Sequence, residues 1–187
     1  MGFVIGLAKS DRLAGNLRTK DFVVTQINEE LIETTCQEVA ALDATALSTA
    51  MEALGQSQPN LLAFVMATCE ELETEAAELG VYVFFVVHRS FEHAAGVQLE
   101  PASQAEVLEA EERNDALLAS MGEADASFLS RVEESEFSAH PVMVHYIVDV
   151  LAGYGDEEGE GGLSGEEKWL LFYVLNTVVD VLDELMH

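Results

Sequence analysis

The sequence predicts an all-α protein built from two copies of a four-helix unit, each unit made of two helical hairpins, with the two halves related by a pseudo-twofold axis. Residues 43–59 match residues 125–141 without a gap at six of seventeen positions, which indicates an internal duplication. The match resumes after about nine extra residues in the second copy, so that residues 75–91 correspond to residues 166–182. Helix-start signals at equivalent positions of both copies favour helices throughout.

The duplication divides the chain into successive segments. Residues 1–26 form a basic N-terminal arm, residues 27–95 the first repeat, residues 96–108 a linker and residues 109–187 the second repeat. An acidic, glycine-rich loop at residues 153–163 interrupts the second repeat. We expect the two halves to pack as one compact unit.

The start of a helix is signalled twice in each copy. Asp43 and Asp125 each precede an alanine-led amphipathic stretch, where a carboxylate can accept hydrogen bonds from the amides of the first turn. Pro59 and Pro141 suit the first turn of the next helix, because an amide hydrogen has no partner there. The expected helices span residues 27–41, 44–54, 59–72, 74–94, 109–121, 125–136, 141–152 and 165–186.

The fourth helix of each copy is the most apolar. Residues 81–87 taken alone are rich in strand formers, but the equivalent stretch lies in the helix-length apolar run 165–186. The duplication therefore favours a helix, and a small sheet formed with residues 3–7 and 22–27 is the alternative. Helices this apolar are typical of a central position or of an oligomer interface, which leaves a homodimer open.

If these two helices meet at the pseudo-twofold axis, some of their polar residues should lie close together there. Arg89 is expected to pair with Asp180 or Asp183 across the axis. Asn176 lies among apolar neighbours, where a buried amide can fix the way in which helices pair.

The net charge of −27 is unevenly distributed. Residues 1–20 carry +3, so the remainder carries −30. Such a body repels phosphates, which argues against direct binding of nucleic acid or of an anionic membrane. The partners that remain are a basic protein surface, a divalent cation or the chain's own N-terminal arm. The longest apolar run, residues 81–87, is far shorter than the ~20 residues of a membrane span, and we expect a cytoplasmic protein.

Four residues are candidate metal ligands. His88 and Glu92 share one helical face, and Asp180 and Asp183 lie three residues apart. One observation argues against a metal site. His88 and His93 in the first copy do not align with His140 and His145 in the second. No phosphate-binding loop, nucleophile elbow or paired CxxC motif is present, so the sequence predicts no cofactor and no catalytic residue.

Two classes of function remain after these exclusions, and a third possibility is that the acidic charge serves only solubility. The first is an acidic interaction or scaffold protein that binds a basic protein surface without catalytic activity. The alternative is a magnesium- or manganese-dependent all-α hydrolase of a phosphorylated small molecule, with carboxylates from the long helices as ligands. The sequence does not decide between them.

Overall fold

The computed structural model describes residues 26–122, 125, 127–135, 139–155 and 162–187. These residues form eight helices and no strand, which confirms the all-α prediction. Most of the basic arm and of the acidic loop lies outside the described residues. The helices are α1 (Glu29–Ala40), α2 (Ala44–Ser57), α3 (Pro59–Cys69), α4 (Thr74–Ala95), α5 (Gln104–Met121), α6 (Phe128–Glu133), α7 (Pro141–Gly153) and α8 (Gly165–Met186).

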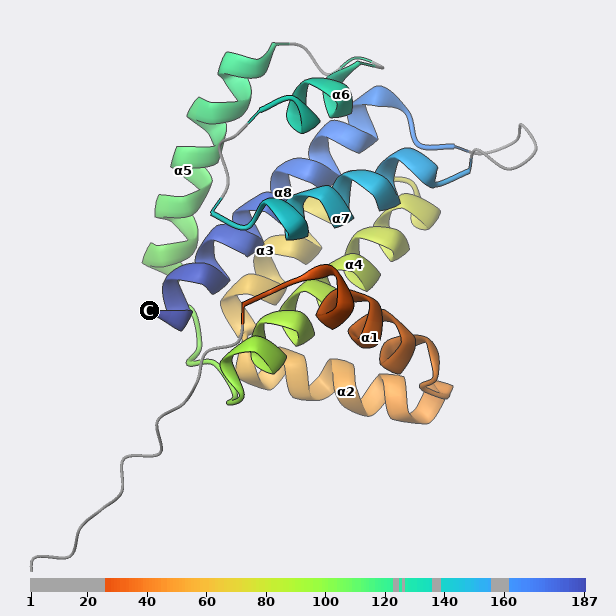
Figure 1. Cartoon of the computed structure of the whole chain (residues 1–187), viewed down its shortest axis with the longest axis vertical. Helices are drawn as coiled ribbons and strands as arrows, with labels where there is room; N and C mark the ends of the chain where they lie inside the picture. Colours follow the sequence, from red (N-terminus) through yellow and green to blue (C-terminus); the bar gives the residue numbers. More distant parts are fainter. Residues whose placement is uncertain (1–25, 123–124, 126, 136–138, 156–161) are drawn as a thin grey trace, which may run out of the picture.

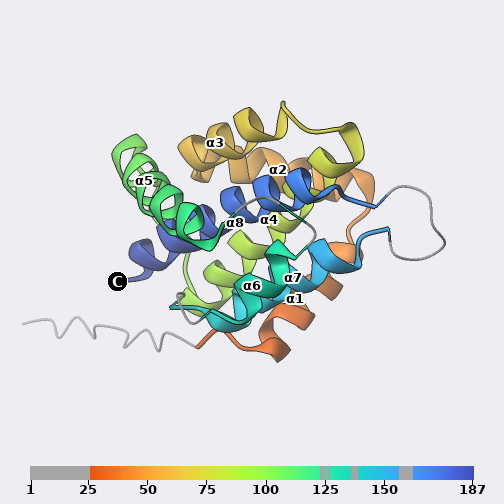
Figure 2. The ribbon, with the colours of Figure 1, turned by 90° about the horizontal axis from the view of Figure 1, so that it is seen from above.

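The two longest helices, α4 and α8, pack against each other at the centre of the molecule (Figure 1). Helix α3 contacts both of them, α1 packs on α4, and α5 and α7 pack on α8. Seen from above, α2, α3 and α5 lie on one side of the central pair and α1, α6 and α7 on the other (Figure 2). The fold is therefore three layers of helices with the two longest helices in the middle.

The composition of α8 explains its place. It is apolar on nearly all sides and buries every residue from Leu171 to Val179, so only a position surrounded by other helices satisfies it. Helix α4 carries the strand-forming run at residues 81–87 and is nevertheless helical, because there its side chains are buried by α1, α3 and α8. The alternative of a small sheet is therefore wrong for residues 81–87, which are helical. No helix in the described ranges combines the length and apolar content needed to cross a membrane.

Close approach of α4 to α8 depends on a glycine. A Cβ atom at Gly80 would lie 2.6 Å from Cδ2 of Leu171 and 3.2 Å from Sγ of Cys69. These distances are shorter than ordinary van der Waals contact, so a side chain at this position would push the helices apart. The sequence alignment of the predicted repeats places Gly80 opposite Leu171, and these two residues meet where the central helices touch.

The helix starts follow the sequence signals with two exceptions. The carboxylate of Asp43 accepts hydrogen bonds from the amides of Thr45 and Ala46 at 3.0 and 2.9 Å, and Pro59 and Pro141 open α3 and α7. Helix α5 begins at Gln104, within the predicted linker 96–108, because Ser103 and Glu106 form a capping box there. Helix α6 begins at Phe128 and ends at Glu133 instead of spanning residues 125–136.

Asp125 does not cap that helix directly. Its carboxylate accepts hydrogen bonds from the hydroxyl of Ser127 at 2.7 Å and from the amide of Ser127 and Nη1 of Arg131, each at 2.9 Å. The Ser127 hydroxyl, followed by Arg131 and the Ser127 amide, lowers the pKa of the Asp125 carboxyl to about 2. The aspartate thus closes a turn just before the helix, and Ser127 occupies the capping position.

Helix α2 is packed less tightly than the rest. Of its 14 residues only Leu54 and Ser57, in its last turn, are buried. The side of α2 that faces α4 carries small residues such as Ala50, which cannot fill the space beneath a helix. Two cavities flank α2 as a result, and both border α4.

Candidate ligand pocket and acid-rimmed groove

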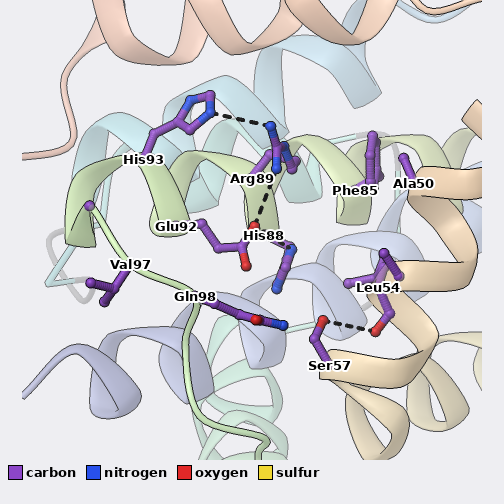
Figure 3. A pocket seen from close by; sticks show the side chains of 12 residues that line it. Ala50, Leu54, Ser57, Phe85, His88, Arg89, Glu92, His93, Val97 and Gln98 are labelled. Atoms are coloured by element: carbon purple, nitrogen blue, oxygen red, sulfur yellow. Dashed lines mark hydrogen bonds and ion pairs between the residues drawn. The ribbon is translucent and has the colours of Figure 1, made fainter. Parts of the chain in front are cut away.

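The larger cavity lies between α2 and the C-terminal half of α4 and encloses about 650 Å³. Its apolar lining comes from Ala50 and Leu54 of α2 and from Phe85 of α4. Its polar lining is mixed with these: His88 and Glu92 of α4 face the same space as Gln98, and Ser57 of α2 lies across from them (Figure 3). A volume of this size is within the range of small-molecule sites, which runs from ~300 to ~1,000 Å³.

His88 is the least usual residue in this pocket. Its side chain is 3% exposed, and neither ring nitrogen has a hydrogen-bond partner within the described part of the chain. Burial, with a smaller contribution from the neighbouring Arg89 charge, lowers the pKa of His88 to about 4. The ring is therefore neutral at pH 7, and it offers one acceptor and one donor to the cavity.

Glu92 lies beside His88, as their spacing on one helical face predicts. Its Oε2 is 3.8 Å from Nδ1 of His88 and 3.5 Å from Nη1 of Arg89. Burial raises the pKa of the Glu92 carboxyl, and the Arg89 and His93 charges partly oppose that effect. The pocket thus combines a half-buried carboxylate with a neutral imidazole.

The predicted pairing of Arg89 with Asp180 or Asp183 is wrong. Arg89 instead contacts Glu92 and, through Nη2, the Nε2 atom of His93 at 3.5 Å. Partners three and four residues along the same helix lie on the same face and are reached without ordering a long-range contact. Arg89 stands at the pocket rim with 41% of its side chain exposed.

Asp180 and Asp183 belong to a different cluster. Asp180 accepts a hydrogen bond from Asn114 at 2.9 Å, and Asp183 lies 2.6 Å from Nε2 of His140 and 3.4 Å from Nε2 of His187. Burial raises the pKa of Asp180, although the Asn114 hydrogen bond opposes this. The four candidate metal ligands are therefore held in two sets of contacts, one on α4 and one at the end of α8.

Asn176 joins α8 to α5. Its amide nitrogen donates to Oδ1 of Asn114, and Asn114 in turn donates to Asp180 and to the carbonyl of Ala110. Both asparagines are 1% exposed. This buried network links α5 to α8, and the role that the sequence suggested for Asn176 in fixing how helices pair stays a prediction.

Within the described ranges, one further group has metal-ligand geometry. Glu133, His145 and Asp149 place a ligand atom each within 4.8 Å of one another, and all three residues are exposed. Exposed groups of this kind are common on acidic surfaces. None of the four candidates from the sequence belongs to this group.

The second cavity, of about 520 Å³, lies on the other side of α2 and is called here the acid-rimmed groove. Apolar side chains from three helices form it, and Glu70 and Glu78 stand at it. The apolar residues are Leu47 and Met51 of α2, Met66 and Cys69 of α3, Ala77, Val81, Tyr82 and Phe85 of α4, and Leu72 between α3 and α4. Leu47, Met66 and Tyr82 are respectively 39%, 44% and 39% exposed.

Sequence reasoning identified His88 and Glu92 but missed the walls of both cavities. A signal for them was present in the repeat alignment. The alignment places Ala46 and Ala50 of α2 opposite Phe128 and Val132 of α6. At these positions α2 has smaller side chains than α6, and the larger cavity adjoins Ala50.

Comparison with known proteins adds no relative: no family model matches the chain, and no match was found among curated proteins or solved structures.

Proposed function

We propose that this protein binds a basic amphipathic helix of a partner protein in the acid-rimmed groove, without catalytic activity. One observation carries the proposal. Of the six large hydrophobic side chains exposed in the described part, three line this single groove: Leu47, Met66 and Tyr82. Exposed apolar side chains that gather in a groove mark an interaction site more often than isolated ones do.

The composition of the groove suits a helix. Amphipathic helices bind by laying an apolar stripe into a hydrophobic groove. Met51 and Met66 supply flexible side chains that adapt to the shape of such a stripe. The polar face of the bound helix would then lie near Glu70 and Glu78.

Charge defines the partner as basic. The Lys and Arg residues of the described part, Arg89, Arg113, Arg131 and Lys168, all lie outside the groove lining. A protein of charge −27 attracts a cationic segment over a distance and repels an anionic one. The occupant we propose is therefore a helix with Lys or Arg on its polar face.

Binding of a designed peptide tests the proposal. The probe is a helix of about 20 residues with leucine on one face and lysine on the other, and the matched peptide carries glutamate in place of lysine. We expect fluorescence anisotropy to show saturable binding of the lysine peptide, weakened by added salt. Preference for the glutamate peptide, or equal binding of both, would overturn the proposal.

Two variants locate the binding surface. Met66→Glu places a charge in the groove and is expected to weaken peptide binding by at least about tenfold. Leu108→Glu makes the same kind of change at an exposed residue of α5, outside the groove, and should leave binding unchanged. Equal effects of the two variants would mean that the peptide binds to the acidic surface at large.

The basic arm is a second possible occupant of the groove. Deleting residues 1–20 is expected to leave peptide affinity unchanged if a partner is the natural occupant. A gain of affinity after deletion would show that the arm competes for the groove. A sedimentation coefficient of the protein alone that does not change with its concentration would exclude a second copy of the chain as the occupant of the groove.

The hydrolase alternative requires divalent metal. It is separated from the binding function by a thermal-shift measurement with magnesium, manganese and zinc, since a ligand that binds the folded state raises the melting temperature. No carboxylate side chain in the described part is fully buried, so no observation favours this alternative over peptide binding.

We also infer that the two halves arose by duplication of one four-helix unit. In support, the first and third helices of each half pack on the fourth, and the second packs on the third. Helices α4 and α8 have the same length of 22 residues, and α3 and α7 both open with proline. An experimental structure in which residues 27–95 do not superpose on residues 109–187 would reject the duplication.

A further inference from the structure

The pocket between α2 and α4 contains unused hydrogen-bonding capacity. His88 is 2% exposed, yet Nδ1 and Nε2 both lack a hydrogen-bond partner among the residues that the structure describes. Buried polar atoms in folded proteins nearly always have a partner, and a missing one lowers stability. The ring borders a cavity of about 650 Å³, so a molecule in that cavity can supply the missing partner.

The spacing between His88 and Glu92 indicates what kind of atom fits. Nδ1 of His88 and Oε2 of Glu92 are 3.8 Å apart, too far for a direct hydrogen bond. A single nitrogen donor placed between them can reach both at about 2.9 Å, the usual length of such bonds. Both atoms are acceptors when the imidazole is neutral with its hydrogen on Nε2.

We propose that this pocket binds a small organic amine with an apolar body, whose ammonium group donates hydrogen bonds to Glu92 and to the neutral ring of His88. The apolar body packs against Phe85 of α4 and Leu54 of α2. Nε2 of His88 remains as a donor for an oxygen atom of the ligand or for water. This binding site shares Phe85 with the acid-rimmed groove but does not depend on the proposed function.

Charge favours an amine over an anion. The net charge of −27 raises the local concentration of cations and lowers that of anions. Glu92 would repel a carboxylate or phosphate placed beside His88. Arg89 already neutralises part of the Glu92 charge from 3.5 Å, so an incoming ammonium competes with Arg89 for the same oxygen.

A metal ion is less well supplied with ligands at this place. In the described ranges, no group of three His, Cys, Asp or Glu side chains close enough to hold a metal ion includes His88 or Glu92. The Arg89 guanidinium also contacts the carboxylate oxygen of Glu92 that a metal ion would need.

Three probes that share a phenyl ring test the proposal on the full chain: 2-phenylethylammonium, 2-phenylethanol and 3-phenylpropionate. We expect the ammonium to bind at one site with a Kd in the millimolar range or tighter. The alcohol should bind at least about tenfold more weakly because it forms no charge-assisted hydrogen bond. Methylammonium, which lacks an apolar body, controls for attraction to the acidic surface and should show no saturation.

Three substitutions identify the residues responsible. Glu92→Gln and His88→Leu should each weaken binding of 2-phenylethylammonium by about tenfold or more. Arg89→Gln should strengthen it severalfold, because it removes the competing cation. Glu75→Gln, an equal charge change at an exposed position of α4 outside the pocket, should have no effect.

A nuclear magnetic resonance measurement keeps the test independent of variant folding. In the wild-type protein labelled with ¹⁵N in histidine, the ammonium should shift the ring resonances of His88 and leave those of exposed His145 unchanged. Tighter binding of 3-phenylpropionate, weaker binding in Arg89→Gln, or unshifted His88 resonances at saturation would each overturn the proposal. Stabilisation by zinc with no response to the amine would also overturn it.

Discussion

The two central helices have very different covers. On α8, the short helix α6 inserts Phe128, whose ring meets that of Phe172 edge-on at 5.6 Å between centroids. On α4, the repeat alignment places Ala46 of α2 at the position of Phe128. Helix α6 is six residues long and buries half of them, whereas α2 is 14 residues long and buries two.

This difference indicates why the cavities lie beside α2. In each half the first and third helices pack on the fourth and the second packs on the third, and α4 and α8 meet in one common core. Where the covering helix carries large side chains, the cover is part of the core. Where it carries alanines, the same arrangement leaves one polar pocket and one apolar groove, and His88 occupies the position that Val179 has in the other half.

The largest effect on stability should come from truncating Phe128, the buried side chain with which α6 packs on α8. Phe128→Ala is expected to lower the free energy of unfolding by about 3–5 kcal/mol, because Phe128 is fully buried and its loss leaves a cavity. Leu47→Ala, at an exposed position of α2, should change it by less than about 0.5 kcal/mol. Urea denaturation measures both, and similar costs for the two variants would remove the distinction between the covers.

Lowering the pH should reduce the free energy of unfolding through protonation of His88. Its pKa is about 4 in the folded protein against 6.5 ordinarily, so the unfolded chain takes up the proton first as the pH falls. The stabilisation from the neutral ring is complete above pH 6.5 and is lost between pH 6.5 and 4, a change of about 3 kcal/mol. The raised pKa of Glu92 acts in the opposite direction, since the folded state binds that proton more readily.

Comparison of variants isolates this contribution. Unfolding free energies at several pH values should fall more steeply toward pH 4 for the wild type than for His88→Leu. His145→Leu, at a histidine with 62% of its side chain exposed, should keep the wild-type slope. Parallel slopes for wild type and His88→Leu would show that the imidazole is solvated or already paired.

The contact between α4 and α8 should not accommodate a larger residue at Gly80. Gly80→Ala places a Cβ atom 2.6 Å from Cδ2 of Leu171, which is itself fully buried and cannot easily move. We expect a net loss of about 1–3 kcal/mol despite the higher helix propensity of alanine. Thermal unfolding followed by circular dichroism measures the loss. A stabilised variant would mean that α4 and α8 are less closely packed than the structure has them.

Local signals in the sequence were sufficient for the helices. Asp43, Pro59 and the apolar run of α8 act through nearby backbone or through burial on all sides, and such effects can be read from a few consecutive residues. The strand propensity of residues 81–87 was overridden by burial, which only the repeat comparison revealed. Asp125 was misassigned because Ser127 lies closer to the first turn and takes the capping position.

The candidate site was less predictable. The spacing of His88 and Glu92 on one helical face correctly brought them together, but no local pattern specifies that a cavity adjoins them. That cavity depends on what α2 fails to fill, and the side-chain volume beneath a helix is a property of two elements distant in the sequence. The partner of Arg89 was also mispredicted. Arg89 pairs with Glu92 on its own helix and not with Asp180 or Asp183 of α8.

The smallest effect we predict concerns α2 itself. Gly55 lies inside this helix, and Gly55→Ala should stabilise the protein by about 0.5–1 kcal/mol by reducing the freedom of the unfolded chain. The new Cβ atom would lie 3.2 Å from Cδ2 of Leu62, the far end of a flexible side chain that can shift by a few tenths of an ångström. Differential scanning calorimetry should show a higher melting temperature. A lower one would mean that α2 and α3 are packed as tightly there as α4 and α8 are at Gly80, and that the loose packing of α2 is confined to the side facing α4.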